Sequence, residues 1–227
     1  MNRWTDFHAH ILPQADHGCD SLDTALRQLK LAQNAGIGCI VATPHFYPDR
    51  RGTEEFPAMR DKAIDELREG YTGPVEILAG AEVFLCEGLQ NYPQLSKLRI
   101  ENTNILLVEM PTAPWPTRLL DTLCALRDAG YEPLLAHIDR YPRRDMNGLL
   151  ASGFRGQLNP EGILPLHRRA RAFHLVGEGT VCALGSDIHG ASPEAYRDYI
   201  RAMRVLADRG ILLQKNMKSL LGRYRQE

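Results

Sequence analysis

Residues 4–11 read WTDFHAHI, a short apolar segment in which acidic and histidine side chains occupy every second position. Side chains alternate between the two faces of a β-strand, so Asp6, His8 and His10 point the same way if this segment is a strand. Six further short apolar segments follow, and helical periodicity fills the gaps between them. We therefore expect seven strands, at residues 4–11, 37–43, 75–83, 104–110, 133–138, 154–159 and 181–187.

The helical stretches between these strands carry recognisable start and stop signals. In the clearest one, SPEAYRDYIRAMRVLADRG, Ser192 suits the N-cap, Pro193 the first helical position and Gly210 the C-terminal cap. Regular alternation of apolar strands and helices indicates an α/β fold with a parallel sheet covered on both faces. Both a (β/α)7 barrel and a doubly wound sheet fit this pattern, in one domain spanning residues 1–227. Other helical stretches are expected to stop at Gly36, Gly70 and Gly130.

Composition and charge narrow the class of protein. The 227 residues are 44% hydrophobic and 24% charged, which is typical of a globular protein. The 27 Lys and Arg residues against 28 Asp and Glu residues lack the basic excess of most nucleic-acid-binding proteins. Five cysteines form no CxxC pair, no secretory leader is recognisable, and no apolar run approaches the ~20 residues that span a bilayer. We expect a cytoplasmic protein with no nucleic-acid partner and no membrane insertion.

Polar residues that interrupt the apolar segments fall at or just past their C-terminal ends. In a barrel of parallel strands these ends lie on one face, where sites are built. Imidazole and carboxylate groups brought together there are ligands for Mn, Fe or Zn. We therefore predict a metal site whose candidate ligands are His8, His10, His17, His45, Glu82, Glu109, His137, Asp187 and His189.

The motifs DFHAHILP, ATPH, GAE, VEM, AHIDRY and SDIHG, in this order, resemble those of the polymerase and histidinol phosphatase (PHP) superfamily. More narrowly, the chain is similar to the bacterial manganese-dependent protein-tyrosine phosphatases of capsule and exopolysaccharide operons. The resemblance covers essentially the whole chain and implies a distorted, TIM-like (β/α)7 barrel with three divalent metal ions, Mn first, with Fe and Zn as alternatives. It also implies a phosphotyrosine protein as partner, such as a bacterial tyrosine autokinase of polysaccharide synthesis.

Carried over by position, the resemblance distributes the ligands over three metal sites. Asp6 would orient a ligand histidine, and the Arg140 guanidinium would contact the phosphate. The first site would use His8, His10, Glu82 and Asp187; the second Glu82, Glu109 and His137; the third His17, His45 and His189.

Two positions depart from the pattern of the phosphatase branch. That branch usually reads D-D-G after HILP, whereas this chain has His17 between Asp16 and Gly18. It also usually has a phosphate-binding arginine several residues after the SDxHN motif, where this chain has Glu194. Candidates to replace that arginine are Arg197 and the loop residues Arg50 and Arg51.

The expected chemistry is hydrolysis of a phosphomonoester, most of all phosphotyrosine, by a metal-bridging hydroxide. Three divalent ions held by three carboxylates leave a surplus of positive charge that favours both a phosphate dianion and hydroxide. No cysteine is followed by arginine at the spacing of cysteine-based phosphatases, C-x5-R. No general acid is identified.

Three other functions stay open. The same chemistry could act on a small metabolite such as histidinol phosphate, or on a nucleotide. An amidohydrolase shares the H-x-H pattern of the first strand, and a non-catalytic metal-binding module would also use these ligands. Features outside the strand ends receive simpler interpretations: Trp115 anchors a loop, and the basic segment HRRARAFH, residues 167–174, forms a solvated surface.

Overall fold

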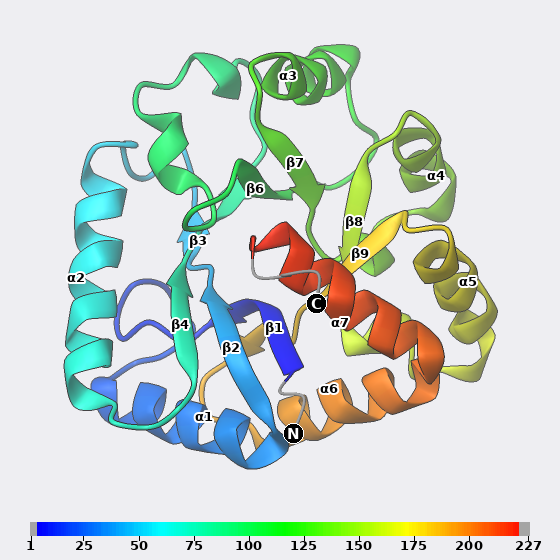
Figure 1. Ribbon diagram of the computed structural model, residues 1–227. Helices are drawn as coiled ribbons and strands as arrows, with labels where there is room; N and C mark the ends of the chain where they lie inside the picture. Colours follow the sequence, from blue (N-terminus) through cyan, green and yellow to red (C-terminus); the bar gives the residue numbers. More distant parts are fainter. Residues whose placement is uncertain (1–3, 223–227) are drawn as a thin grey trace.

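The computed structural model describes residues 4–222, whose strands form two parallel sheets (Figure 1). The four-stranded sheet has the order β10-β1-β2-β4, and the six-stranded sheet has the order β3-β5-β6-β7-β8-β9. The strands are β1 (Trp4–His10), β2 (Ile37–Ala42), β3 (His45–Phe46), β4 (Glu76–Ala79), β5 (Glu82–Phe84), β6 (Ile105–Glu109), β7 (Glu132–Leu135), β8 (Arg155–Leu158), β9 (Val181–Leu184) and β10 (Ile188–His189).

Each of the seven predicted apolar segments overlaps a strand, although β7 begins one residue before the predicted segment 133–138 and Ile138 belongs to a 3-10 turn. Three strands continue after a short break into a strand of the other sheet: β2 and β4 of the four-stranded sheet into β3 and β5, and β9 of the six-stranded sheet into β10. Hydrogen bonds also cross the breaks, from the Asp187 amide to the His8 carbonyl (2.8 Å) and from the Glu82 amide to the Pro44 carbonyl (3.1 Å). A mixed α/β fold with parallel sheets is thus confirmed, whereas closure of the strands into a barrel stays a prediction.

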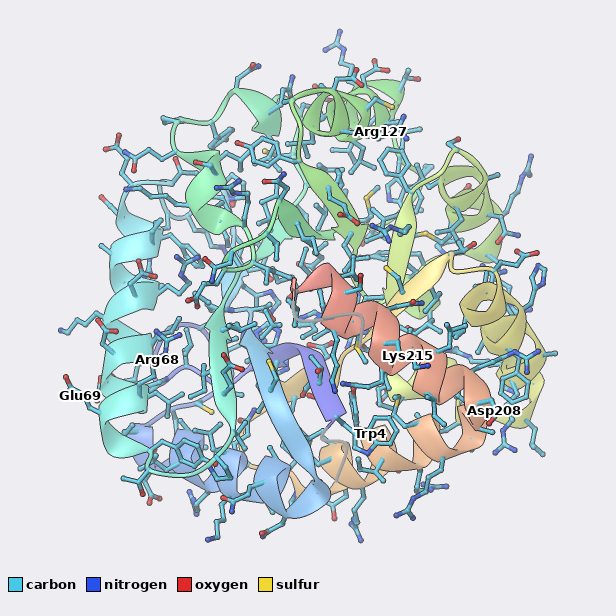
Figure 2. The ribbon with its side chains drawn as sticks, viewed as in Figure 1. Trp4, Arg68, Glu69, Arg127, Asp208 and Lys215 are labelled. Atoms are coloured by element: carbon cyan, nitrogen blue, oxygen red, sulfur yellow. The ribbon has the colours of Figure 1, made fainter. Side chains whose placement is uncertain are left out.

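Seven α-helices surround the sheets in the described part of the chain (Figure 1). Their inward faces are apolar because the sequence repeats at the helical period. On α2, Arg68 extends toward β4 and donates to the Ile77 carbonyl (2.6 Å), while the exposed Glu69 points away from the sheet (Figure 2). The helices are α1 (Leu22–Ala35), α2 (Glu55–Gly70), α3 (Thr117–Asp128), α4 (Arg143–Ala151), α5 (Leu166–Gly177), α6 (Pro193–Leu206) and α7 (Asp208–Leu220), with 3-10 turns η1 (Leu89–Asn91), η2 (Leu95–Leu98), η3 (Ile138–Arg140) and η4 (Pro160–Gly162).

The predicted C-terminal cap at Gly210 is wrong. The helix begins at Pro193 as expected but ends at Leu206, and Gly210 lies in the first turn of α7. A Cβ atom at this position would lie 2.5 Å from the Met203 carbonyl oxygen. The glycine is therefore required by the close approach of α7 to the last turn of α6. By contrast, Gly36 ends α1 in the left-handed conformation (φ +86°), as predicted.

Helix α7 covers the amino-terminal ends of the strands. Its Gln214 side chain accepts from the Thr5 amide and donates to the Thr5 hydroxyl, both at 3.0 Å, and the Tyr199 hydroxyl donates to the Thr5 carbonyl. The apolar core fills the space between the sheets and the helices. The carboxyl ends of the strands, where the polar candidates lie, are left to form a site. Within residues 4–222, no helix has the length and apolar character needed to cross a membrane.

Candidate metal centre

The polar side chains predicted at six strand ends do gather at one place. Four ligand atoms face one another: His8 Nε2, His10 Nε2, Glu82 Oε2 and Asp187 Oδ1. The two imidazole nitrogens are 3.1 Å apart, and each lies 3.3 Å from Glu82 Oε2. Asp187 Oδ1 lies 3.2 Å from His10 Nε2 and 3.6 Å from His8 Nε2. These atoms come from β1, β5 and the segment between β9 and β10.

These separations fit a divalent cation. With metal–ligand bonds of about 2.1 Å, neighbouring ligand atoms of an octahedral or tetrahedral site are about 3.0–3.4 Å apart. Two imidazole nitrogens that face each other across 3.1 Å also gain little unless a proton or a cation lies between them. The four side chains are buried, so bulk water does not hydrogen-bond to their polar atoms. The donor set and spacing thus match the first of the three predicted sites.

A second cluster is built around the other side of Glu82. Its Oε1 lies 2.7 Å from His137 Nε2, and its Oε2 lies 2.9 Å from His45 Nδ1. Glu109 Oε2 is 3.9 Å from His45 Nδ1, and His45, Glu82 and Glu109 together can hold an ion. The carboxylate of Glu82 therefore faces two clusters, as a bridging ligand must.

The third predicted cluster is assembled differently. His10, His45 and His189 have ligand atoms within 4.8 Å of one another. The exposed His17 stacks beside them, with its ring centroid 4.8 Å from that of His45 and 4.6 Å from that of His189. Among the described residues, the compact group with His45 and His189 is therefore completed by His10. His17, which was predicted as the third member, lies beside the group.

Several buried polar atoms of the site have no hydrogen-bond partner among the described residues. An unpaired buried polar group costs about 1–3 kcal/mol, so such atoms are rare in native proteins. A bound cation would satisfy lone pairs of this kind. The unpaired site atoms are His45 Nδ1, Glu82 Oε2, Glu109 Oε2 and His137 Nδ1.

The pKa values of the two glutamates of the site, Glu82 and Glu109, are shifted in opposite directions. Burial by itself would raise the pKa of Glu82, but the His8 charge and the neighbouring imidazoles, including that of His137 at 2.7 Å, hold it well below its usual range. Burial and the charge on Glu82 both raise the pKa of Glu109. Glu82 is thus the strongly anionic centre of the site, and Glu109 is the carboxylate that most lacks a cation.

Two residues of the site lie in strained backbone conformations. His137 (φ +30°) and Asp187 (φ +52°) both have positive φ angles, which L-residues rarely adopt. Such conformations persist where the surrounding structure enforces them, often at functional sites. At Gly185, a Cβ atom would lie 2.4 Å from His8 Cβ. Only glycine at this position lets the end of β9 lie against β1 and present Asp187 to the cluster.

Two side chains that sequence reasoning missed hold the histidines in place. Asp16 Oδ2 lies 2.6 Å from His10 Nδ1 and accepts from the His45 amide at 3.0 Å. Although burial opposes it, the bond to His10 holds the pKa of Asp16 well below its usual range. Gln157 Oε1 lies 3.3 Å from His8 Nδ1 and accepts from the His137 amide at 2.7 Å. Contacts of this kind orient ligand imidazoles.

Signals for both residues were present in the sequence. Asp16 directly precedes His17 in the motif that departs from the phosphatase branch, and a carboxylate in a loop after a strand rich in histidine is a candidate partner for an imidazole. Gln157 and Asn159 are polar residues at the end of a predicted strand, the same signal that identified the other candidates. Asn159 donates to Asp187 Oδ2 at 3.0 Å.

Asp6 has a different position from the one expected. Its carboxylate contacts no imidazole; it accepts from the Ser186 amide (2.8 Å), the Ser186 hydroxyl (2.6 Å) and, at 3.4 Å, the His8 amide. The reason is that Ser186, which follows β9, donates to both carboxylate oxygens of Asp6. Asp6 therefore anchors the segment that carries Asp187. Burial raises the pKa of Asp6 to about 6.

The predicted phosphate-binding arginines differ in placement. Arg140 forms an ion pair with Asp187 Oδ2, and its side chain is 54% exposed, so it lies at the mouth of the site. Arg197 pairs with Glu194 on the exposed face of α6. Arg50 lies over the Tyr47 ring, 4.8 Å from its centroid, and Arg51 is exposed. Of these arginines, Arg140 is the one that contacts a predicted ligand.

Comparison with known proteins shows which family the sequence matches. A family model described as "Capsular polysaccharide synthesis, CpsB/CapC" matches residues 4–197. Tyrosine-protein phosphatase YwqE of Bacillus subtilis is 27% identical over 196 residues, covering 81% of this chain and 76% of that protein. Tyrosine-protein phosphatase CpsB of Streptococcus agalactiae serotype V is 24% identical over 202 residues, covering 81% and 82%.

A solved structure shows a similar fold. It is described as belonging to "YwqE from Bacillus subtilis and CpsB from Streptococcus pneumoniae, unique metal-dependent tyrosine phosphatases". The TM-score is 0.75 at 22% identity, and the match covers 98% of this chain and 96% of that one.

Proposed function

The chain belongs to the CpsB/CapC family of capsular polysaccharide synthesis proteins, and from that premise we propose that it is a metal-dependent phosphatase that hydrolyses phosphotyrosine in proteins. The observation that carries the proposal is the convergence of ligand atoms from His8, His10, Glu82 and Asp187 at separations of 3.1–3.6 Å. Family membership supplies the reaction class, and the cluster supplies a site fit for it.

Bound divalent cations would supply Lewis-acid chemistry, lowering the pKa of water and neutralising charge on the phosphoryl group. The residues of the chain hold and orient this site. His8, His10, Glu82 and Asp187 would hold one cation, and Glu82 with Glu109, His45 and His137 a second. Asp16 and Gln157 orient the imidazoles through their second nitrogen atoms or backbone amides.

Arg140 is the residue placed to bind the phosphoryl group. It lies at the mouth of the site, beside Asp187, with half of its side chain exposed. A planar guanidinium offers two parallel N–H donors that match the oxygens of a phosphate. Arg140 would therefore orient the phosphoryl group of the substrate, whose phenolate leaving group has a pKa near 10.

We further infer three divalent cations, with Mn²⁺ preferred over Fe and Zn, and a third position formed by His45, His189 and His17 or His10. The partner would be a phosphotyrosine protein such as a tyrosine autokinase, in the cytoplasm. The two sheets would act as the wall of one distorted seven-stranded barrel, spanning a single phosphoesterase domain of residues 1–227. The continuation of β2, β4 and β9 into the other sheet supports this arrangement.

The proposal is tested by stripping the protein of metal and assaying it before and after addition of Mn²⁺, Fe²⁺ or Zn²⁺. We expect hydrolysis of a phosphotyrosine peptide that is lost on chelation and restored best by Mn²⁺. A panel containing histidinol phosphate and nucleoside monophosphates at the same concentration separates the substrate classes. Faster turnover of one of these small phosphates would overturn the protein-phosphatase assignment, and turnover that survives chelation would overturn the metal dependence.

A further inference from the structure

A second pocket lies beside the metal centre. It has a volume of about 410 Å³ and lies among η3, the start of α4 and α5. This size falls in the range of ligand-binding pockets. Its apolar part is formed by Ile138, Leu158, Ala172 and Leu175, and its basic part by Arg140, Arg143, Arg168 and Arg171.

Two of the four arginines of this pocket, Arg143 and Arg171, have no carboxylate partner in the described part of the chain, whereas Arg140 pairs with Asp187. The one carboxylate in its lining is Asp139, which lies 3.8 Å from Arg168 Nη1 and accepts from the Asn159 amide at 3.0 Å. Within residues 4–222, Arg143 and Arg171 form neither an ion pair nor a hydrogen bond. Burial and the facing charge of Arg143 both lower the pKa of Arg171. Both guanidinium groups thus line the pocket without a carboxylate partner among the described residues.

The helix that supplies this charge was expected to be a solvated surface. That expectation holds for His174, which is exposed and pairs with Glu178 on the same helix. It is wrong for Arg168 and Arg171, which are three residues apart and so lie on one face of α5, toward the pocket. Periodicity could not show this because the opposing side chains belong to η3 and α4.

The pocket adjoins the proposed site of reaction through Arg140. Arg140 is shared, because it lines the pocket and forms an ion pair with Asp187 of the metal cluster. Tyr141 also lines the pocket, and its ring lies 5.7 Å from that of His137 between centroids. A peptide whose phosphotyrosine enters the metal site would therefore place neighbouring residues over the pocket.

We propose that this pocket is a second anion-binding subsite, which recognises an acidic group of the peptide substrate away from the phosphotyrosine. Guanidinium groups bind carboxylates and phosphates through paired N–H donors, and the apolar floor accommodates the carbon atoms that carry the acid. The acidic group is a carboxylate or a second phosphoryl group, since both have this chemistry. This subsite rests on the proposed function and determines its peptide specificity; Arg143 and Arg171 position the substrate and take no part in the chemical step.

The test compares Arg143→Gln and Arg171→Gln with Arg144→Gln. Arg143 and Arg144 are both exposed neighbours on α4, but only Arg143 lines the pocket, so Arg144 is a matched control. Four substrates are assayed: p-nitrophenyl phosphate and three phosphotyrosine peptides of equal length flanked by glutamine, glutamate or phosphoserine. We expect the wild type to prefer one of the two acidic peptides over the glutamine-flanked peptide. A preference for glutamate identifies a carboxylate as the recognised group, and a preference for phosphoserine identifies a second phosphoryl group.

In each pocket variant, kcat/KM for the preferred acidic peptide should fall roughly 10-fold, the value of one charged hydrogen bond, through KM with kcat unchanged. Turnover of p-nitrophenyl phosphate and of the glutamine-flanked peptide should be unaffected, because these substrates do not reach the pocket. The proposal is overturned if all four substrates lose turnover equally, if no substrate responds, or if Arg144→Gln has the same effect.

A binding measurement separates this proposal from the proposed function. A fluorescein-labelled, glutamate-flanked peptide with phenylalanine in place of phosphotyrosine is titrated with protein, and its anisotropy is followed. Binding by the wild type that weakens in both pocket variants and at 0.5 M NaCl supports the subsite even if no phosphotyrosine peptide is hydrolysed. Equal binding by the wild type and both variants overturns the subsite, even if the phosphatase activity is present.

Discussion

The two ends of the same parallel strands are built in opposite ways. At the amino end, the Thr5 amide and hydroxyl pair with Gln214, and the Thr5 carbonyl accepts from Tyr199. At the carboxyl end, four buried polar atoms lack hydrogen-bond partners, among them Glu82 Oε2 and His137 Nδ1. Around Thr5 the chain satisfies its own polar groups, whereas the four unpaired atoms at the carboxyl end all belong to residues of the predicted metal site.

This difference means that the amino end of the strands contributes to stability, whereas the carboxyl end is built for function. A satisfied buried hydrogen bond stabilises the fold by about 1 kcal/mol, whereas an unsatisfied polar atom costs about 1–3 kcal/mol. The carboxyl end therefore lowers the stability of the metal-free protein, and the amino end, sealed by α7, contributes to it. Changes at the two ends should have effects of different kinds, which the following experiments measure.

The largest effect is expected from Glu82→Gln. The substitution removes the charge that faces both clusters, so we expect kcat/KM for a phosphotyrosine peptide to fall by at least about 10³-fold, comparable with loss of a major electrostatic contact. Glu87→Gln is the control, since Glu87 is exposed just beyond β5. Retention of activity by Glu82→Gln, assayed with metal analysis of the purified protein, would contradict the assignment of Glu82 as a bridging ligand.

Metal addition should stabilise the carboxyl end specifically. At a Mn²⁺ concentration of 100 times the dissociation constant, binding to the folded state adds about 2.7 kcal/mol to the free energy of unfolding. Urea denaturation of stripped protein with and without Mn²⁺ measures this gain. The gain should be lost in Glu82→Gln and kept in a variant of the amino end; an equal gain in all three proteins would show that Mn²⁺ binds elsewhere.

Gln214→Ala should have the reverse effect. It leaves the buried Thr5 amide without its acceptor, so we expect a loss of about 2 kcal/mol in the free energy of unfolding. Specific activity of the folded protein at low temperature should be unchanged, because Gln214 lies at the end of the strands away from the metal cluster. Lys215→Ala, the exposed neighbour on α7, is the matched control and should change neither quantity (Figure 2).

The smallest effect is expected from Asp16→Asn. The amide keeps the shape of the side chain but weakens the charged contact with His10 Nδ1, so we expect metal affinity to fall roughly 10-fold. Competition with a chromogenic chelator measures this change. Asp20→Asn in the same loop is the control, since Asp20 contacts Ser21 and Thr24 at the start of α1. Equal affinities for the two variants would leave Asp16 with no part in orienting His10.

Much of the fold follows from local pattern. Each predicted apolar segment overlaps a strand because a run of apolar β-type residues bounded by helical periodicity has few other conformations. The error at Gly210 has a definite cause: a glycine after an amphipathic helix usually caps it, but here the glycine permits close contact with Met203. Local pattern does not distinguish a cap from a packing contact between two helices.

In the site, too, local pattern predicted some features and the folded chain decided others. Asp6, His8 and His10 show their common direction through two-residue spacing, yet only the folded chain shows that Asp6 contacts Ser186 instead of a histidine. His45 was assigned to one cluster by position, and the structure places it between two. Distances between residues far apart in sequence depend on the register of the strands and the paths of the loops.

The amino-acid sequence by itself determined the alternation of strands and helices and the identity of the nine candidate ligands, because both follow from periodicity and from the position of polar residues at strand ends. The tertiary structure alone decided which ligand atoms share a cluster, how Asp16 and Gln157 support them, and that arginines of α4 and α5 face one pocket beside Arg140. The physical reason is that electrostatic and hydrogen-bond interactions act over a few ångströms in space, a distance that separation along the chain does not specify.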